Sequence, residues 1–165
     1  MIIRLFRPQD VEQIALLFHN TVRQINIKDY SQAQVRAWSP DNIYFRDWLN
    51  LCSTRFTYIA EQNDEIIGFG ELESDGHIDC FYVHYLHQGR GVGKNIYRAI
   101  EDRAKQLCLS RLYVEASITA EPFFIRRGFT TLKEQQVVCR AEILVNYIME
   151  KTLYDNLSWS LNLLV

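Results

Sequence analysis

Hydrophobic and polar residues follow two different periods along the chain, and the changes of period mark its elements. An apolar segment at 2–6 is followed by Pro8 and by a stretch whose apolar residues recur every three or four positions. That spacing predicts a helix with one buried face. Period-two alternation, typical of half-buried strands, dominates from 55 to 83. The pattern therefore predicts a first strand, a long helix and then a β-meander.

Turn-forming residues divide these stretches. Asn63-Asp64 and Asp75-Gly76 predict tight turns between antiparallel strands, and Ser39-Pro40-Asp41 separates two short helices. The expected strands are 2–6, 55–61, 65–74, 77–83, 111–117, 129–139 and 142–150, with a helix at 92–108 and a short one closed by Gly128. The order β-α-α-β-β-β-α-β-α-β-β predicts a mixed α/β domain of the α+β type with one sheet.

Length and composition fit a soluble globular protein. The 165 residues suggest one domain at 1–150, followed by an apolar extension at 151–165. We expect this extension to pack on the body or, alternatively, on a partner subunit in a homodimer. No run is long enough to span a membrane and no signal segment is evident, which predicts a cytoplasmic protein. The net charge of -2 makes nucleic acid an unlikely partner.

The cysteines favour the same compartment and give little support for a metal site. They are widely spaced and form no CxxC pair, so reduced thiols are expected: Cys52, Cys80, Cys108 and Cys139. Cys80 with His84 and His87 is a conceivable metal-binding set. Because metal ligands normally come in a tighter and fuller group, we expect no metal.

The stretch "HQGRGVGKN" at 87–95 looks like a phosphate-binding loop. A P-loop needs glycine where Gln88 stands and a hydroxyl where Asn95 stands. A dinucleotide-binding turn needs its third glycine where Lys94 or Ile96 stands. Both nucleotide loops are therefore excluded.

The pattern that fits runs from Gln88 and Gly89 through Arg90, Gly91 and Val92 to Gly93, between a strand ending "FYV" and a helix. With "LYVEAS" and "PFFIRRGF", it resembles the coenzyme A pyrophosphate loop of the GNAT (Gcn5-related) N-acetyltransferases. The segments "YSQAQVRAW", "VEASITAEPFF" and "QQVVCRAEILVNYIMEK" resemble the YafP-like branch of that family. The resemblance covers residues 2–150. It implies the GNAT fold: one twisted, mostly antiparallel sheet with splayed central strands and flanking helices.

The chemistry of the loop agrees with this resemblance. Glycines allow backbone N–H groups to converge, and a helix N-terminus adds the positive end of its dipole, so pyrophosphate is held without a metal. Arg90 and Lys94 are the candidate phosphate-binding cations. The resemblance implies that pantetheine lies between strands 77–83 and 111–117. It further implies that the Val83 N–H polarises the thioester carbonyl, next to the backbone of Phe81 and Tyr82.

Acidic residues lie before the loop: seven carboxylates and no lysine or arginine occur between 61 and 79. Asp79 lies four residues before Val83 on the same strand face, and burial there would raise the pKa of a carboxylate. Asp79 is therefore the first candidate for the base or amine-binding group. His77 is the rival candidate, and Glu71 and Glu73 are further ones, acting on the acceptor through a water.

Two positions depart from the family pattern. Phe124 stands where the family commonly has the tyrosine thought to protonate the leaving thiolate, and Ser117 stands where an asparagine is common. The resemblance implies that both contact the cofactor. Because Phe124 cannot donate a proton, water or another group must do so. Tyr30 and Trp38, in the first helices, are either core residues or a wall of the acceptor site.

The resemblance implies transfer of an acetyl group from acetyl-CoA, the only cofactor expected, to a primary amine of a small molecule or peptide. The amine would attack directly in a ternary complex. The alternative is a module that senses CoA or acyl-CoA with weak catalysis, which the loss of the proton donor at Phe124 favours. Acetylation of aminoacyl-tRNA is disfavoured by the slightly acidic charge.

Overall fold

The computed structural model describes residues 1–154, which form seven strands and five α-helices. The strands are β1 (Ile2–Leu5), β2 (Phe56–Gln62), β3 (Glu65–Leu72), β4 (Phe81–Val83), β5 (Arg111–Ser117), β6 (Thr130–Cys139) and β7 (Glu142–Thr152). The helices are α1 (Val11–Gln24), α2 (Gln32–Trp38), α3 (Trp48–Thr54), α4 (Val92–Gln106) and α5 (Glu121–Ile125). Short 3-10 turns occur at Pro8–Asp10, Asn26–Lys28 and Tyr85–His87.

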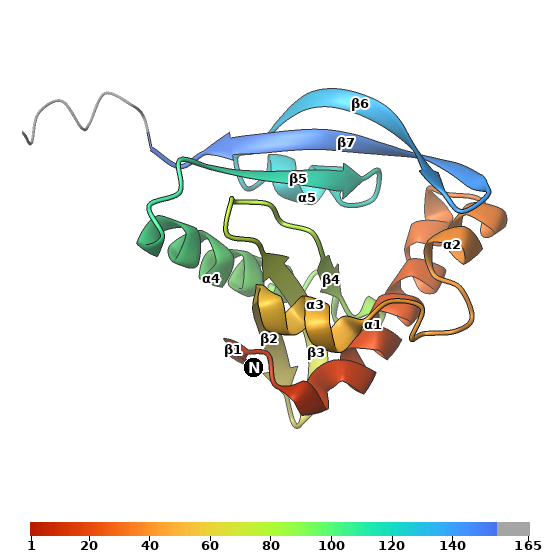
Figure 1. Ribbon diagram of the computed structural model, residues 1–165, viewed down its shortest axis with the longest axis horizontal. Coiled ribbons are helices and arrows are strands. Elements are labelled where there is room, and N and C mark those ends of the chain that lie inside the picture. Colours follow the sequence, from red (N-terminus) through yellow and green to blue (C-terminus); the bar gives the residue numbers. More distant parts are fainter. Residues whose placement is uncertain (155–165) are drawn as a thin grey trace, which may run out of the picture.

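The strands form two antiparallel sheets, β1-β2-β3-β4 and β5-β7-β6 (Figure 1). An isolated parallel bridge between His77 and Tyr113 joins the two where β4 and β5 diverge. The predicted mixed α/β class with splayed central strands is confirmed. The expected single sheet is divided, because β4 and β5 do not pair along their length.

The strand predicted at 77–83 is wrong in length, since only its last three residues form β4. The preceding residues bond to both sheets: Glu71 N–H donates to Cys80 O and Glu73 N–H to His77 O, both at 2.8 Å, whereas Ile78 N–H donates to Tyr113 O at 2.9 Å. The turn that starts this crossing requires glycine. Gly76 has φ +98°, and a Cβ there would collide with Arg111 O.

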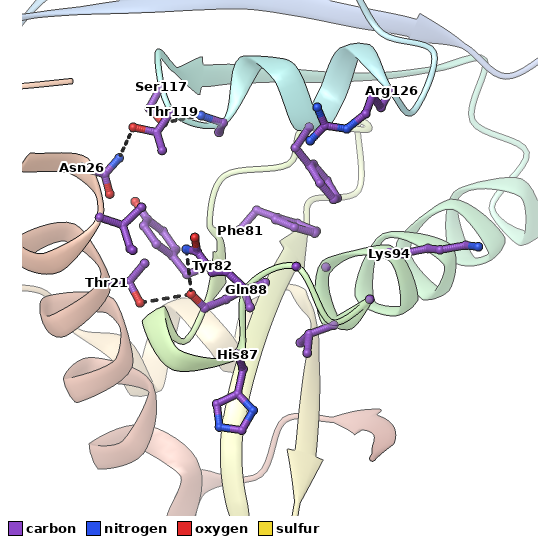
Figure 2. A pocket seen from close by; sticks show the side chains of 18 of the residues that line it. Thr21, Asn26, Phe81, Tyr82, His87, Gln88, Lys94, Ser117, Thr119 and Arg126 are labelled. Carbon is purple, nitrogen blue, oxygen red and sulfur yellow. Dashed lines mark hydrogen bonds between the residues drawn. The ribbon is translucent and has the colours of Figure 1, made fainter. Parts of the chain in front are cut away.

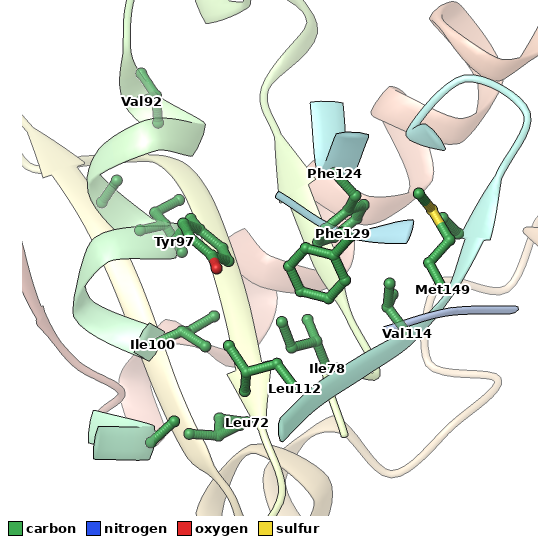
Figure 3. Close-up of a cluster of buried hydrophobic side chains, with 14 of the residues drawn as sticks. Leu72, Ile78, Val92, Tyr97, Ile100, Leu112, Val114, Phe124, Phe129 and Met149 are labelled. Atoms are coloured by element: carbon green, nitrogen blue, oxygen red, sulfur yellow. The ribbon is translucent and has the colours of Figure 1, made fainter. Parts of the chain in front are cut away.

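Both faces of the first sheet are buried, which explains the nearly uniform burial of β3. One core lies under α1 and α3, around Phe18, Trp48 and Phe69. The other lies between α4 and the second sheet (Figure 3). Gly68 and Gly70 let α4 approach β3 closely, because a Cβ on either would lie 2.8 Å from Ile96. This contact fixes the N-terminus of α4 and hence the glycine loop before it.

The other predicted boundaries agree closely with the structure. The Asn63-Asp64 turn has φ of 52° and 64°, the left-handed pair of a tight hairpin. β7 runs to Thr152, two residues past its predicted end. The remaining part of the apolar extension, 155–165, lies outside the described residues. None of the described helices has the length and apolar character needed to cross a membrane.

The N-terminal strand is fixed by a buried ion pair. Arg4 donates to both carboxylate oxygens of Asp10, at 2.7 and 2.9 Å, and the Arg7 N–H donates to the same group at 2.7 Å. Burial alone would raise the pKa of Asp10, but these donors outweigh it, so the pKa is lowered. Its stabilising contribution is therefore complete above the ordinary carboxylate pKa, about 4, and is lost as the pH falls through the lower folded value.

We expect Asp10→Asn to lower the melting temperature at pH 7 by roughly 4–8 °C, the equivalent of about 2 kcal/mol for a charge-assisted pair in a chain of this size. The difference from wild type should shrink as the pH falls below the ordinary carboxylate pKa, about 4, toward the lower pKa of the folded state. Thermal unfolding followed by circular dichroism measures both. Asp64→Asn, at an exposed turn position, is the matched control. A loss for Asp10→Asn that is equal at pH 7 and pH 3 would contradict the ion-pair explanation.

Candidate active site

The free edge of β4 faces the gap between the two sheets. Backbone groups in an antiparallel ladder alternate in direction. Cys80 and His84 bond to β3, through Glu71 N–H to Cys80 O and His84 N–H to Ile67 O. The N–H and C=O of Val83 therefore point into the gap. The Val83 carbonyl accepts from Thr21 Oγ1 at 3.3 Å and from Gln88 Nε2 at 3.5 Å, which leaves its N–H directed into the gap.

A pocket of about 460 Å³ lies in this gap, with α1 and α4 on either side of it and α5 above (Figure 2). It brings together most of the predicted cofactor-binding residues. Those lining it are Phe81, Tyr82, Val83, Gln88, Gly89, Gly91, Val92, Gly93, Lys94 and Ser117. Seven further lining residues were not among the predicted ones: Thr21, Asn26, His87, Thr119, Phe123, Arg126 and Arg127.

The glycine loop has the geometry of an anion cradle. Gly89 and Gly91 have φ of +73° and +83°, and a Cβ on either would meet no atom within 4 Å, so both face open space. The first intrahelical hydrogen bond at this end of α4 runs from Asn95 N–H to Gly91 O at 3.1 Å. The N–H groups of Val92, Gly93 and Lys94 therefore have no intrahelical acceptor. These groups and the helix dipole fit a pyrophosphate.

The cations around the pocket differ from those expected. Lys94 lines it, whereas Arg90 does not. Arg126 and Arg127 line it instead, and Figure 2 shows Arg126 on the α5 side of the pocket. Within the described part of the chain, the buried Nε of Arg127 has no hydrogen-bond partner, which suits an incoming phosphate oxygen. The only sequence signal for these two arginines was the "RR" pair before Gly128.

The prediction that Phe124 contacts the cofactor is wrong. Phe124 is only 1% exposed and packs in the core, 5.1 Å from the Phe129 ring centroid (Figure 3). Its neighbour Phe123 reaches the pocket and lies 5.1 Å from the Phe81 ring centroid. On α5, Phe124 therefore points into the core, and Phe123, one residue earlier, points into the pocket. Ser117 does line the pocket, and its Oγ accepts from Ala120 N–H at 3.1 Å.

A second pocket, of about 350 Å³, adjoins the first. Tyr82 and Ser117 line both, so the two cavities meet at these residues. The predicted acceptor residues Tyr30 and Trp38 line the second pocket with Phe18, Phe45 and Glu115. Tyr30 also has a structural role, because its hydroxyl donates to Val145 O at 2.6 Å and accepts from Ile118 N–H at 2.9 Å.

Asp79 lines the second pocket, but the expected rise in its pKa is wrong. Burial works to raise the pKa, yet the guanidinium groups of Arg55 and Arg46 outweigh it and lower the pKa below its ordinary value. Arg55 contacts the carboxylate directly and Arg46 Nη2 lies 3.2 Å from it. Asp79 is therefore a fixed carboxylate that stays ionised at neutral pH.

The other three acidic or basic candidates lie behind the second pocket and do not line it. Glu71 is fully buried and accepts from Arg55 Nη1 at 2.6 Å, and burial raises its pKa despite that partner. Glu73 pairs with Arg55 at 2.7 Å. His77 Nε2 lies 2.5 Å from Glu115 Oε2, so His77 reaches the pocket only through Glu115. None of the three lines either pocket. The role of His77 as the rival base, and the roles of Glu71 and Glu73 through a water, stay predictions.

The conceivable metal set of Cys80, His84 and His87 is not brought together. His84 and His87 converge with Glu65 on one side of β4, whereas Cys80 converges with Glu71 and Asp79 on the other. Arg55 bridges the two carboxylates of the second group, so a guanidinium already supplies the positive charge there.

This combination of splayed strands, a glycine loop at a helix N-terminus and a second adjoining pocket is characteristic of one enzyme class. A family model for the acetyltransferase (GNAT) domain matches residues 26–152. The chain therefore belongs to the GNAT acetyltransferase family, and it is an acyltransferase.

Individual relatives agree with this assignment. The chain is 32% identical over 148 residues to the N-acetyltransferase YafP of Escherichia coli, covering 89% of this chain and 93% of the relative, which places it in the YafP-like branch. A GCN5-related N-acetyltransferase from Rhodopseudomonas palustris has a TM-score of 0.86 at 31% identity, covering 92% and 94% of the two chains. The PaiA N-acetyltransferase of Thermoplasma acidophilum, solved with coenzyme A, shares the fold with a TM-score of 0.74 at 16% identity, covering 92% and 98%.

We expect Arg55→Met to destabilise the protein by roughly 3 kcal/mol, because it leaves the buried Glu71 carboxylate without its cation. Adding Glu71→Gln should recover part of the loss, since the neutral amide carries no unpaired charge. Chemical denaturation at pH 7 measures both free energies of unfolding. Arg98→Met, at an exposed position on α4, is the control. A double variant less stable than Arg55→Met would refute this role for Glu71.

Proposed function

We propose that the protein transfers the acetyl group of acetyl-CoA to a primary amine of a small molecule or peptide, by direct attack in a ternary complex. One observation carries the proposal: the pocket at the glycine loop and the pocket beside Asp79 meet at Tyr82 and Ser117. A donor held in the first pocket and an acceptor held in the second would bring their reacting ends together there. This arrangement favours direct transfer over a sensing module with only one binding site.

The proposed reaction begins with deprotonation of the acceptor and ends with release of CoA. The acceptor ammonium loses a proton to water, its nitrogen lone pair attacks the thioester carbon, and the carbonyl oxygen takes up negative charge. The Val83 N–H, which points into the gap, is assigned to that oxygen. The C–S bond then breaks, its electron pair leaves on sulfur, and the second proton of the new amide nitrogen passes through water to that sulfur. Ser117, whose Oγ accepts from Ala120 N–H, is assigned to donate a hydrogen bond to the departing sulfur without losing its proton.

Asp79 enters this proposal as a permanent negative charge on the wall of the acceptor pocket. Its lowered pKa makes it a weak base, so water carries the proton away. His77 does not touch the acceptor in this proposal. It acts through Glu115, to which it is hydrogen-bonded. Tyr30 and Trp38 supply the apolar wall.

Binding of acetyl-CoA should raise the melting temperature. At a ligand concentration of 100 times Kd the gain is about 2.7 kcal/mol, or roughly 5–10 °C for a chain of this size. Gly91→Glu should abolish the shift, because the new carboxylate fills the open space before α4 and repels phosphate. Val138→Glu adds the same charge at a position that is 78% exposed and should keep the shift. Wild-type protein without any shift in millimolar acetyl-CoA would refute the proposed donor.

Asp79→Asn should raise KM for the amine about threefold, by weakening the attraction of a partly exposed charge worth under 1 kcal/mol, and should leave KM for acetyl-CoA unchanged. The acid limb of the kcat/KM profile should stay in place, because the pKa of Asp79 is too low to produce a limb near neutral pH. Steady-state kinetics between pH 5 and 9 measure this. Disappearance of that limb in Asp79→Asn would show instead that Asp79 is the base.

The acceptor itself is best sought with a mass-spectrometric screen of primary amines and short peptides incubated with acetyl-CoA. A mass increase of one acetyl group, dependent on the protein and lost in Gly91→Glu, identifies a substrate. Consumption of acetyl-CoA without any acetylated product would favour the sensing module.

A further inference from the structure

One face of the second sheet carries polar residues into the acceptor pocket. Ser117 of β5 pairs in register with Asn146 of β7, and Glu115 lies two residues before Ser117. Opposed residues in an antiparallel pair share a face, as do residues two apart along a strand. The side chains of Ser117, Asn146 and Glu115 are therefore neighbours, and all three line the pocket. Ser117 also marks the junction with the donor pocket.

The Asn146 amide oxygen has no hydrogen-bond donor among residues 1–154, although it is shielded from solvent. A buried carbonyl oxygen left without a donor costs about 1–3 kcal/mol. The χ2 torsion of asparagine is soft, so the amide can turn in place and present its oxygen to the pocket. A ligand that brings an N–H donor to this point would remove the cost.

Glu115 offers a negative charge beside this oxygen. Its Oε2 is engaged by His77 Nε2 at 2.5 Å, while no hydrogen bond to Oε1 occurs within the described residues. Burial works to lower the pKa of His77, but the hydrogen bond to Glu115 and the charges of Glu73 and Asp79 outweigh it and raise the pKa. The His77 ring stacks on Tyr113 at 4.8 Å between centroids, which fixes its orientation. His77 thus holds the Glu115 carboxylate in place.

We propose that Glu115 and Asn146 together form the seat of the acceptor's ammonium group, next to the acetyl group at Ser117. The proposal rests on the proposed function and narrows it to acceptors that arrive as ammonium ions. An ammonium has three N–H donors, which suit one carboxylate oxygen and one amide oxygen and leave one proton facing the water that removes it. Once deprotonated, the nitrogen is already beside the thioester carbon.

Asp79 is a weaker choice for this seat, although it lines the same pocket. Its charge is matched by two guanidinium groups, from Arg46 and Arg55. In the part of the chain that the structure describes, Glu115 has His77 as its one cationic partner, and its side chain is 39% exposed. An incoming cation therefore meets a less compensated charge at Glu115.

The test uses 2-phenylethylamine, whose ring matches the walls formed by Phe18, Phe45 and Trp38. Its affinity is measured by calorimetry on full-length protein saturated with CoA, and its KM with acetyl-CoA. Asn146→Leu and Glu115→Gln should each weaken amine binding by about 10-fold or more, the value of a hydrogen bond to a charged group. KM for acetyl-CoA should not change. Gln136→Leu, an exposed amide on β6, is the control and should leave both constants unchanged.

The melting temperatures of the variants distinguish a role of Asn146 in amine binding from a role in folding. Because the Asn146 amide oxygen accepts no hydrogen bond from residues 1–154, Asn146→Leu should keep or raise the melting temperature while it weakens amine binding. His77→Gln, which retains a donor for Glu115, should preserve amine affinity within about threefold, whereas His77→Leu should lower it as Glu115→Gln does.

The outcomes distinguish the two proposals. Wild type that binds acetyl-CoA but not millimolar 2-phenylethylamine overturns the seat, and so do Asn146→Leu and Glu115→Gln variants with wild-type amine affinity. Wild type that shows no thermal shift with acetyl-CoA overturns the proposed function itself.

Discussion

The backbone at residues 76–80, which bonds to both sheets, is the feature on which the rest of the structure depends. Its carbonyls at His77 and Cys80 accept from the N–H groups of Glu73 and Glu71, while an isolated parallel bridge joins His77 to Tyr113 of β5. Beyond this bridge β4 and β5 diverge, so the N–H of Val83 has no ladder partner and faces the pocket, where a ligand can bind it. The same divergence opens both pockets. A fully paired sheet would have been more regular, but it would have had no room for a substrate.

Arg55 organises the charges behind the second pocket. It bridges Glu71, Glu73 and Asp79, and Arg46 adds a second cation to Asp79. A cluster that looked from the sequence like an acidic hairpin therefore has two guanidinium groups against its three carboxylates. His77 links this cluster to Glu115, because its ring lies 3.5 Å from Glu73 and 2.5 Å from Glu115. The electrostatic field in the second pocket is set less by the number of carboxylates than by which of them already have a cation.

The sequence predicted what local patterns determine. Turn residues at Asn63-Asp64, helical periodicity after Gly91 and alternation in β5 all gave elements within about two residues of those observed. The strand at 77–83 was too long because alternation in "HIDCFYV" continues while the hydrogen-bonding partner changes. The pKa of Asp79 was predicted in the wrong direction because its partners lie 24 and 33 residues earlier in the chain. Such long-range pairs leave no trace in a local pattern.

The candidate site also has one part that local sequence patterns predict and one part that depends on long-range contacts. The glycine loop of the first pocket is one continuous segment, 88–93, so its glycines could be recognised from sequence alone. The second pocket combines side chains of α1, α2, β5, β6 and β7, which only the fold brings together. Asn146 illustrates the difference: in sequence it is one polar residue in a strand, and it becomes informative only once its register partner is known to be Ser117. A main-chain cradle tolerates changes in side chains, whereas a side-chain pocket changes with each one. A family built in this way can keep one donor while its members diverge in their acceptors.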